Sequence, residues 1–182
     1  GFQRYYTDME KMLEEENPDA VCLVAPEPLT CSLSKKIMNH GFPLLMEKPP
    51  GLNSKETREM IKVAEENKIP NQVAFNRRYM PLLTRLKKIL NKNFELDKIQ
   101  NIKYDFFRIG RKDSDFSTTA IHGIDTAKFL ADSDYKYVKF EYQEFPELGE
   151  KVANIYMNCI FQSGTRAYLS FCPVTGVVVE RA

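Results

Sequence analysis

Lys48 is the residue whose type and placement most clearly indicate chemistry. It lies between Glu47 and Pro49, directly after residues 43–46, a short apolar run that predicts a strand. Pro49 excludes the helical backbone region for Lys48, so the direction of its amine is restricted. Because open α/β sheets bind ligands at the carboxyl ends of their strands, a cation held there is a candidate binding or catalytic group. The alternative is a solvated lysine that accompanies Glu47.

His122 is the second candidate. It falls in a predicted helix over residues 118–130, where Thr118, His122, Asp125 and Phe129 share one face at positions i, i+4, i+7 and i+11. A histidine titrates near neutral pH, so an imidazole in such a polar row is a candidate proton acceptor. Asp125 either contacts a substrate or holds the helix through a backbone amide, and both interpretations stay open.

The elements that must position Lys48 alternate between strands and helices, the pattern of βαβ units in a parallel sheet. The run over residues 20–25 is continuously apolar, which is typical of a strand buried on both faces. Asn53, with Glu56 three residues later, predicts an N-cap and capping box for the helix after Lys48. The other expected elements are helices over residues 8–16 and 32–39 and a strand over residues 72–75.

The second half of the chain changes from a helical to an alternating period, which indicates an antiparallel sheet. Pro81 begins an amphipathic helix that leads into it. Residues 101–106 and 138–143 alternate between apolar and polar side chains, so we expect two strands that each bury one face. The aromatic run within residues 104–107 is expected to belong to the core rather than to a sugar-stacking surface.

Two further strands within residues 153–171 flank Ser163-Gly164, which predicts a two-residue hairpin, although Ser-Gly fixes such a turn less firmly than Asn-Gly. The outer face of this hairpin carries the apolar side chains of Tyr156, Ile160 and Tyr168. Because apolar faces of this kind are often covered by a partner, we expect a homo-oligomer that assembles through the C-terminal sheet.

Composition excludes several classes of partner. The 182 residues are 43% hydrophobic and carry 26 basic and 25 acidic side chains, a net charge of +1, so the sequence lacks the basic surface that nucleic acids or anionic membranes require. Neither a membrane-spanning run nor a signal peptide is recognisable.

The four cysteines lack metal-ligand spacing, so we expect a cytoplasmic protein with reduced, mostly buried thiols and no metal site. They are Cys22, Cys31, Cys159 and Cys172.

Four motifs occur together in an order and spacing that resembles the glucose-fructose oxidoreductase, inositol dehydrogenase and MocA (Gfo/Idh/MocA) family. They are Pro26, the Glu47-Lys48-Pro49 step, Asn76-Arg77-Arg78-Tyr79 followed by Pro81, and Ile121-His122-Gly123-Ile124-Asp125. No single motif is specific, but the combination extends over nearly the whole chain. It favours the functional interpretation of Lys48 over the solvated one.

This resemblance implies an oxidoreductase that uses NAD or NADP and acts on a sugar, cyclitol or related polyol. The implied fold class is α/β plus α+β. Residues 1–78 would be the C-terminal half of a Rossmann domain, and residues 79–182 a mostly antiparallel open-sheet domain for substrate binding and oligomerisation. The family's catalytic residues fall on Lys48 and His122. The implied cofactor contacts are Pro26, Glu47, Lys48, Pro49 and Arg77, and the implied substrate contacts are Lys48, Arg78, Thr118, His122 and Asp125.

The sequence departs from the family pattern in three respects. Its eight glycines contain no G-x-G-x-x-G turn for the pyrophosphate, so we expect the first βαβ units to lie upstream of Gly1, and NAD cannot be told from NADP. The chain stops in the strand-like residues 176–179, where relatives continue. Thr118 stands where many relatives carry an aspartate, and Thr30 where histidine is common. A non-catalytic binding or assembly member, or an inactive fragment, is therefore the alternative.

Oxidising a secondary alcohol requires a base for the hydroxyl proton as hydride leaves for the nicotinamide. A lysine amine is almost fully protonated at neutral pH, and deprotonating it there costs about 4 kcal/mol, whereas a histidine needs no such adjustment. We therefore favour His122 as the proton acceptor and Lys48 as a hydrogen-bond donor to the substrate oxygen. The opposite assignment stays open.

Overall fold

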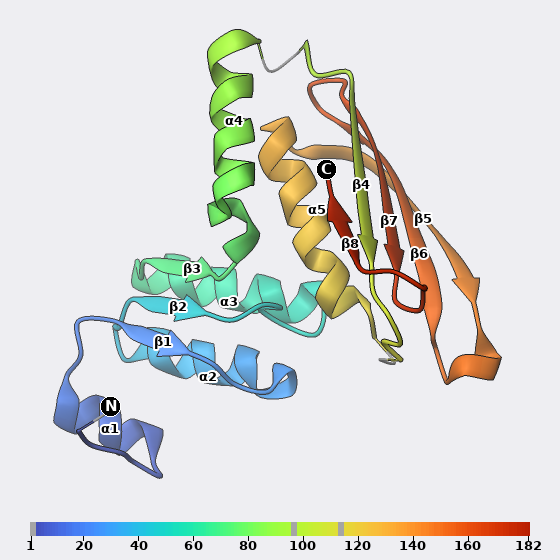
Figure 1. The fold of residues 1–182 in the computed structure, drawn as a ribbon. Coiled ribbons are helices and arrows are strands. Elements are labelled where there is room, and N and C mark those ends of the chain that lie inside the picture. Colours follow the sequence, from blue (N-terminus) through green and yellow to red (C-terminus); the bar gives the residue numbers. More distant parts are fainter. Residues whose placement is uncertain (1–2, 96–97, 113–114) are drawn as a thin grey trace. The chain divides into compact units, whose positions relative to one another are not determined.

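The computed structural model describes residues 3–95, 98–112 and 115–182 and divides the chain into two compact units, Gly1–Ala74 and Phe75–Ala182 (Figure 1). Each unit contains its own sheet and its own buried core. The fold class is a parallel Rossmann-type sheet followed by a mixed open sheet with helices, as the sequence predicted. No helix among the described residues combines the length and the apolar character that crossing a bilayer requires.

The first unit is a three-stranded parallel sheet whose strands are joined by helices, in the order β1-β2-β3. Leu23 pairs with Met46 and Met46 with Val73, so the three strands end together at one edge. This arrangement confirms the predicted βαβ units. The elements in chain order are α1 (Met9–Glu16), β1 (Val21–Leu23), α2 (Glu27–Asn39), β2 (Leu44–Met46), α3 (Ser54–Asn67) and β3 (Asn71–Val73).

Helix α2 begins earlier than the sequence predicted. The sequence predicted a helix over residues 32–39, but α2 starts at Glu27 and takes Pro28 into its first turn. Proline is tolerated there because the first amide groups of a helix have no intrahelical acceptor. Strand β1 is therefore followed almost at once by a helix N-terminus.

The prediction that the first strand is buried on both faces is wrong. Helices α2 and α3 pack against each other and bury Leu44 and Met46 on one side of the sheet. On the other side Val24 is 81% exposed and Leu45 is 41% exposed. Right-handed crossovers between neighbouring parallel strands place successive helices on the same face, and an apolar run alone does not report how many faces are covered.

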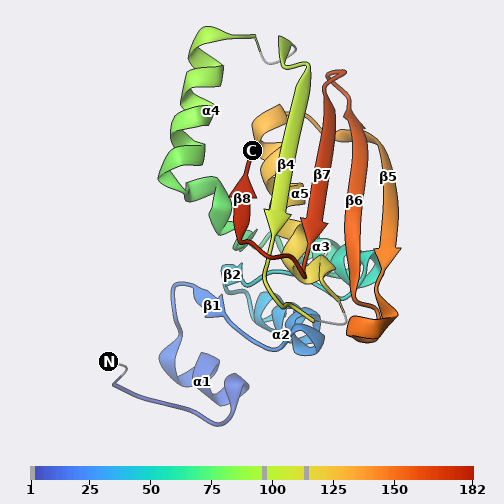
Figure 2. The ribbon, with the colours of Figure 1, turned by 45° about the vertical axis from the view of Figure 1, so that its right-hand side comes forward.

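The second unit is a five-stranded mixed sheet in the order β5-β6-β7-β4-β8, with α5 packed directly on it (Figure 2). All neighbouring strands are antiparallel except β4 and β7, which are parallel because the chain crosses over between them. The elements are η1 (Asn76–Tyr79), α4 (Pro81–Asn93), β4 (Asn101–Phe107), α5 (Ser117–Ala131), β5 (Tyr135–Glu144), η3 (Pro146–Leu148), β6 (Ala153–Phe161), β7 (Arg166–Cys172) and β8 (Val179–Arg181).

The core of the second unit lies between α5 and the inner faces of β4, β6 and β7. Tyr104 and Phe106 are 2% and 1% exposed, so these aromatic side chains belong to the core, as predicted. Of the four cysteines, Cys22 is exposed and the other three are buried, and all are free thiols.

Two details of this sheet differ from the prediction. Strand β5 was expected to bury its face with Val138, Phe140 and Tyr142, but nine of its ten residues are exposed, because β5 is the end strand and α5 packs on β4 and β7 instead. The hairpin between β6 and β7 also has a longer connection than two residues. Thr165 lies outside β7 and its carbonyl accepts from the Phe161 amide at 2.9 Å, while Gly164 takes φ 91°.

Gly123 sets the distance between α5 and the sheet. A Cβ atom added to Gly123 would lie 2.6 Å from Cε1 of Phe171 and 2.7 Å from Cε1 of Tyr104, far closer than carbon atoms approach. Both rings are buried, so neither can swing away without repacking the core. The helix that carries His122 therefore lies against β4 and β7 at a separation that only glycine permits.

We expect Gly123→Ala to destabilise the protein by about 1–3 kcal/mol, because the added methyl forces rings or helix to shift in a packed core. Urea unfolding followed by circular dichroism measures this. Gly176→Ala is the matched control, since a Cβ at Gly176 would meet nothing within 4 Å. Equal stability of the two variants would contradict the close packing of α5.

Candidate active site

The carboxyl edge of the parallel sheet gathers most of the residues predicted to contact a cofactor. The Glu47 amide donates to the Leu23 carbonyl at 3.0 Å, and the Ala74 amide donates to the Met46 carbonyl at 2.8 Å, so the strands stay paired to their last residues. Pro26 follows β1 by three residues and Lys48 follows β2 by two. The structure thus brings Pro26 and the Glu47-Lys48-Pro49 step to one edge of one sheet.

Lys48 is half-buried in the loop that leaves β2. Its backbone amide donates to Oε2 of Glu47 at 3.2 Å, so Glu47 folds back onto the loop. Pro49 is buried, and the Lys48–Pro49 peptide bond is cis.

The remainder of this loop is fixed to the start of α3. Oδ1 of Asn53 accepts from the amides of Lys55 and Glu56, both at 3.0 Å, which confirms the predicted N-cap. Oε2 of Glu56 reaches back to the Leu52 amide at 2.8 Å, one residue before the amide that a standard capping box uses. A Cβ on Gly51 would lie 2.9 Å from Cβ of Glu56, so the chain also passes close to this side chain. Lys48 therefore precedes a tightly held loop.

Pro26 is exposed and directly precedes α2. Its carbonyl accepts from the Leu29 amide at 2.9 Å and from Oγ1 of Thr30 at 3.5 Å. Thr30 is buried and bonded to the backbone at the start of its own helix. It acts there as a structural residue.

In the second unit, α5 carries the other predicted residues. His122 and Asp125 are each 7% exposed, one helical turn apart. The His122 carbonyl accepts from Oγ1 of Thr126 at 2.8 Å. Thr118 lies in the first turn, where its Oγ1 donates to the Asp115 carbonyl at 3.2 Å. Thr118 supplies a neutral hydroxyl at this position and no acid.

Arg78, from η1, makes a two-point ion pair with Asp125. Nε of Arg78 donates to Oδ2 at 2.8 Å and Nη2 donates to Oδ1 at 2.5 Å. The guanidinium also lies 5.7 Å from the ring centre of Phe75 and 5.9 Å from that of Phe129. Hydrogen bonding to Asp125 raises the pKa of Arg78. Asp125 and Phe129 thus meet the same side chain, which agrees with their predicted place on one helix face.

Arg77, the neighbouring residue, pairs with Glu180 on β8. Its Nε donates to Oε1 at 2.7 Å, and the same carboxylate accepts from Nη2 of Arg108 at 2.7 Å and from the Tyr104 hydroxyl at 2.9 Å. Burial disfavours the charged Glu180 carboxyl, but the hydrogen bonds from these three side chains outweigh it and lower its pKa. The sequence did not predict Glu180, Arg108 and this role of Tyr104 as parts of a cluster. The one available indication was Glu180 itself, a single acidic residue in a valine-rich strand.

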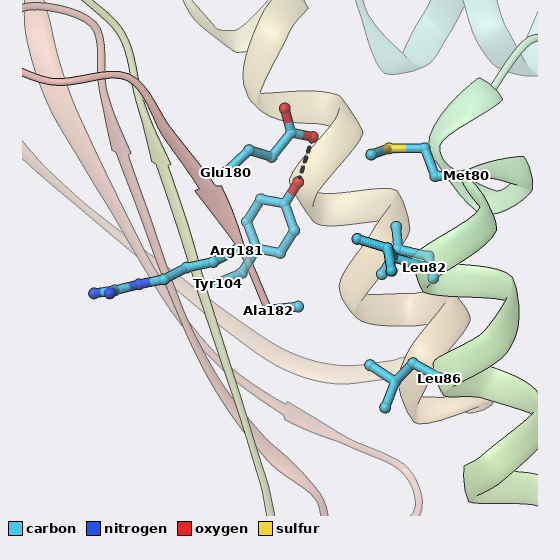
Figure 3. Close-up of a pocket in the computed structure, with 8 residues that line it drawn as sticks. Met80, Leu82, Leu86, Tyr104, Glu180, Arg181 and Ala182 are labelled. Carbon is cyan, nitrogen blue, oxygen red and sulfur yellow. Dashed lines mark hydrogen bonds between the residues drawn. The ribbon is translucent and has the colours of Figure 1, made fainter.

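A cavity of about 260 Å³ lies beside this cluster, within the second unit. Figure 3 shows the Tyr104 hydroxyl directed at Glu180, with Met80 and leucine side chains of α4 on the opposite wall. The lining residues are Met80, Leu82, Leu83, Leu86, Tyr104, Glu180, Arg181 and Ala182. None of the sequence-predicted site residues is among them.

The structure therefore assembles each half of the candidate site separately. The first unit gathers Pro26, Glu47, Lys48 and Pro49 at one sheet edge, and the second holds Arg78 against Asp125 one turn from His122. The convergence of Lys48 with His122 stays a prediction. Among the described residues no group of three His, Cys, Asp or Glu side chains is placed to hold a metal ion.

Parts of this chain resemble known proteins in sequence. Residues 2–75 match the family model described as an oxidoreductase family with an NAD-binding Rossmann fold. The chain is 34% identical over 111 residues to scyllo-inositol 2-dehydrogenase (NADP(+)) IolU of Bacillus subtilis, a match that covers 58% of this chain and 34% of IolU. It is 32% identical over 87 residues to rhizopine catabolism protein MocA of Rhizobium meliloti, covering 48% of this chain and 27% of MocA.

Solved structures share the fold. UDP-N-acetylglucosamine 3-dehydrogenase GnnA of Acidithiobacillus ferrooxidans superposes with a TM-score of 0.83 at 19% identity, covering 98% of this chain and 57% of that one. Myo-inositol 2-dehydrogenase of Lactobacillus plantarum gives 0.76 at 24% identity, covering 93% and 55%. The fold is thus a Rossmann-type unit followed by an open-sheet unit. Residues 2–75 resemble the oxidoreductase family model, and the chain spans about a third of the curated relatives and about half of these solved chains.

We expect Arg78→Ala and Asp125→Ala each to lower the free energy of unfolding by about 1.5–3 kcal/mol, because each leaves a charged partner without its hydrogen bonds. The double variant should lose less than the sum, since neither charge is then left unpaired. Urea titrations of the four proteins measure the coupling. Lys62→Ala, which removes one end of an exposed pair with Glu66, is the control and should unfold like the parent. If the losses in free energy of unfolding of the two single variants add up to that of the double variant, Arg78 and Asp125 do not stabilise the protein through their ion pair.

Proposed function

We propose that the full-length protein is an NAD(P)-dependent oxidoreductase that transfers hydride between the nicotinamide cofactor and a sugar, cyclitol or related polyol. The observation that carries the proposal is Lys48, held at the carboxyl edge of a Rossmann-type sheet by a capped loop. The family match supports the cofactor class. The names of IolU and of the myo-inositol dehydrogenase support a polyol substrate.

The first unit fits the nicotinamide end of such a cofactor. Its three parallel strands end in register, and ligands of open α/β sheets bind outside such ends. Pro26 is exposed there, and Glu47 is turned toward the backbone of its own loop. Pro26, Glu47, Lys48, Pro49 and, by family resemblance, Arg77 would hold the cofactor. When bound, the nicotinamide supplies the acceptor or donor of hydride.

The protein's own residues supply the proton chemistry. His122 takes the hydroxyl proton of the alcohol during oxidation and returns it during reduction, because an imidazole exchanges protons near neutral pH without a large perturbation. Lys48 donates a hydrogen bond to the substrate oxygen and stabilises the negative charge that develops on it. By family resemblance, Arg78, Thr118 and Asp125 complete the substrate side.

A second function is favoured by one observation. Thr118 uses its hydroxyl on the Asp115 carbonyl and contributes no carboxylate one turn before His122. A non-catalytic member of the family that binds ligands or assembles with other proteins would tolerate this residue. We place either form in the cytoplasm, since the four cysteines are free thiols.

A dehydrogenase screen of the full-length protein tests the proposal. We expect cofactor-dependent absorbance changes at 340 nm with NAD or NADP and at least one member of a panel of sugars and cyclitols. Tight NAD(P)H binding, measured by fluorescence, without turnover of any panel member would favour the non-catalytic function. Absence of both binding and turnover in a folded protein would contradict both.

The residue assignments are tested by Lys48→Met and His122→Ala in the active protein. Each should lower kcat by about 10²–10⁴-fold, because each removes a group that acts on the substrate oxygen or its proton. Lys62→Met and His40→Ala are the matched controls, since both side chains are exposed at helix positions away from the sheet edge. Undiminished turnover in either test variant removes that residue from the mechanism.

A further inference from the structure

Asp125 has little capacity left for a substrate. Its side chain is 6% exposed, and each of its two carboxylate oxygens already accepts a hydrogen bond from Arg78. Arg78 uses Nε and Nη2 in this pair, and its guanidinium lies over the rings of Phe75 and Phe129. A substrate hydroxyl that bonded Asp125 directly would have to enter a buried ion pair and loosen it. The pair is therefore better suited to holding α5 than to binding a ligand.

The ion pair holds α5 on the side of the helix that Gly123 does not. Successive residues of an α-helix are about 100° apart around its axis, so Asp125 lies about 160° from Gly123 and about 60° from His122. Gly123 packs against two aromatic rings, one on β4 and one on β7. Helix α5 is thus held from the sheet side at Gly123 and from nearly the opposite side by Arg78, on the flank that carries His122.

Two contacts on different sides of a helix fix its rotation about the axis. A rotation of about 20° would move an atom at the outer radius of the helix, about 5–6 Å from the axis, by about 2 Å. A group that exchanges a proton with a substrate must lie within hydrogen-bond reach of it, and a misplacement of about 1 Å can lower the rate about 10²-fold. The direction of the His122 imidazole therefore depends on the rotation that Gly123 and Asp125 control together.

The backbone of the same turn is anchored by hydroxyl groups. The His122 carbonyl accepts from Oγ1 of Thr126 at 2.8 Å, and the Ile124 carbonyl accepts from the Tyr135 hydroxyl at 2.6 Å. The Tyr135 ring is stacked on a core phenylalanine, with ring centres 4.6 Å apart. Each of these is a single hydrogen bond, whereas a guanidinium fork fixes both oxygens of a carboxylate in one plane. Arg78 therefore supplies the attachment with the most defined geometry.

We propose that Arg78 and Asp125 are positioning residues for His122. Their ion pair fixes the rotation of α5 and thereby the direction of the imidazole. The two side chains serve the substrate side through His122 and not through contacts of their own. The role in turnover rests on the proposed function, whereas the effect on the imidazole is a property of the folded protein and is measured without substrate or cofactor.

Proton NMR of the His122 imidazole in the full-length protein tests the positioning. The signal is assigned by its loss in His122→Gln. Arg78→Lys keeps the positive charge but cannot form the two-point pair, so we expect the His122 signal to shift and broaden in this variant. An unchanged signal in folded Arg78→Lys overturns the proposal. If Arg78→Lys does not fold, Asp125→Asn, which keeps the shape of the side chain without its charge, decides by the same criterion.

Lys87→Met is the matched control. Lys87 on α4 is buried and forms an ion pair at 3.5 Å with Asp132, the residue that ends α5. Asp132 lies about 15 Å from His122 along the helix axis, so loss of this pair should leave the His122 signal unchanged. A signal that moves as much in Lys87→Met as in Arg78→Lys would indicate a general loosening of α5 and would overturn the specific role of Arg78.

Steady-state kinetics separates positioning from direct substrate contact. Arg78→Lys should lower kcat about tenfold or more while KM changes less than about twofold, because a misdirected base slows the chemical step without removing a binding contact. Lys87→Met should retain the parent kcat. A higher KM with an unchanged kcat would assign Arg78 and Asp125 to the substrate itself and overturn the proposal. A full-length protein without dehydrogenase activity contradicts the proposed function alone, and the NMR result then decides the positioning role.

Discussion

The close approach of α5 to its sheet is the constraint on which the second unit depends. Gly123 lets the helix backbone lie against Tyr104 and Phe171, and this contact limits how closely α5 can approach the sheet. His122 and Asp125 flank this position on the sequence, so the glycine that sets the packing distance also sets where the polar row of the helix lies. The core packing at Gly123 thus also helps to fix the position of the candidate site residue beside it.

Local patterns in the sequence predicted the elements that carry the candidate site. The cap at Asn53, the apolar strand before Lys48 and the helical spacing of His122 and Asp125 each depend on neighbouring residues, and the structure contains all three features. The convergence of Lys48 and His122 depends on how two separately built units come together. Spacing within either segment carries no information about that arrangement, so it stays a prediction.

Features that depend on residues far apart in the sequence were not predicted. Glu180 collects hydrogen bonds from Arg77, Tyr104 and Arg108, which are separated from it by between 72 and 103 positions. The exposure of β5 was not predicted for the same reason. The alternation of apolar and polar residues shows which side chains share a face, but it does not show whether another element covers that face. The open face of β1 follows from the handedness of crossovers rather than from its apolar residues.

The two adjacent arginines were predicted to contact ligands, but in the structure both are bonded to carboxylates of the protein itself. Arg77 reaches β8 and Arg78 reaches α5, so η1 is tied to two elements of the second unit by carboxylates in opposite directions. An anionic ligand that used either guanidinium would have to compete with a partly buried carboxylate already bonded to it, and separating such a pair leaves an uncompensated charge. A neutral polyol places no such demand on the arginines. The contacts of Arg77 and Arg78 therefore assign both arginines first to holding β8 and α5 in place.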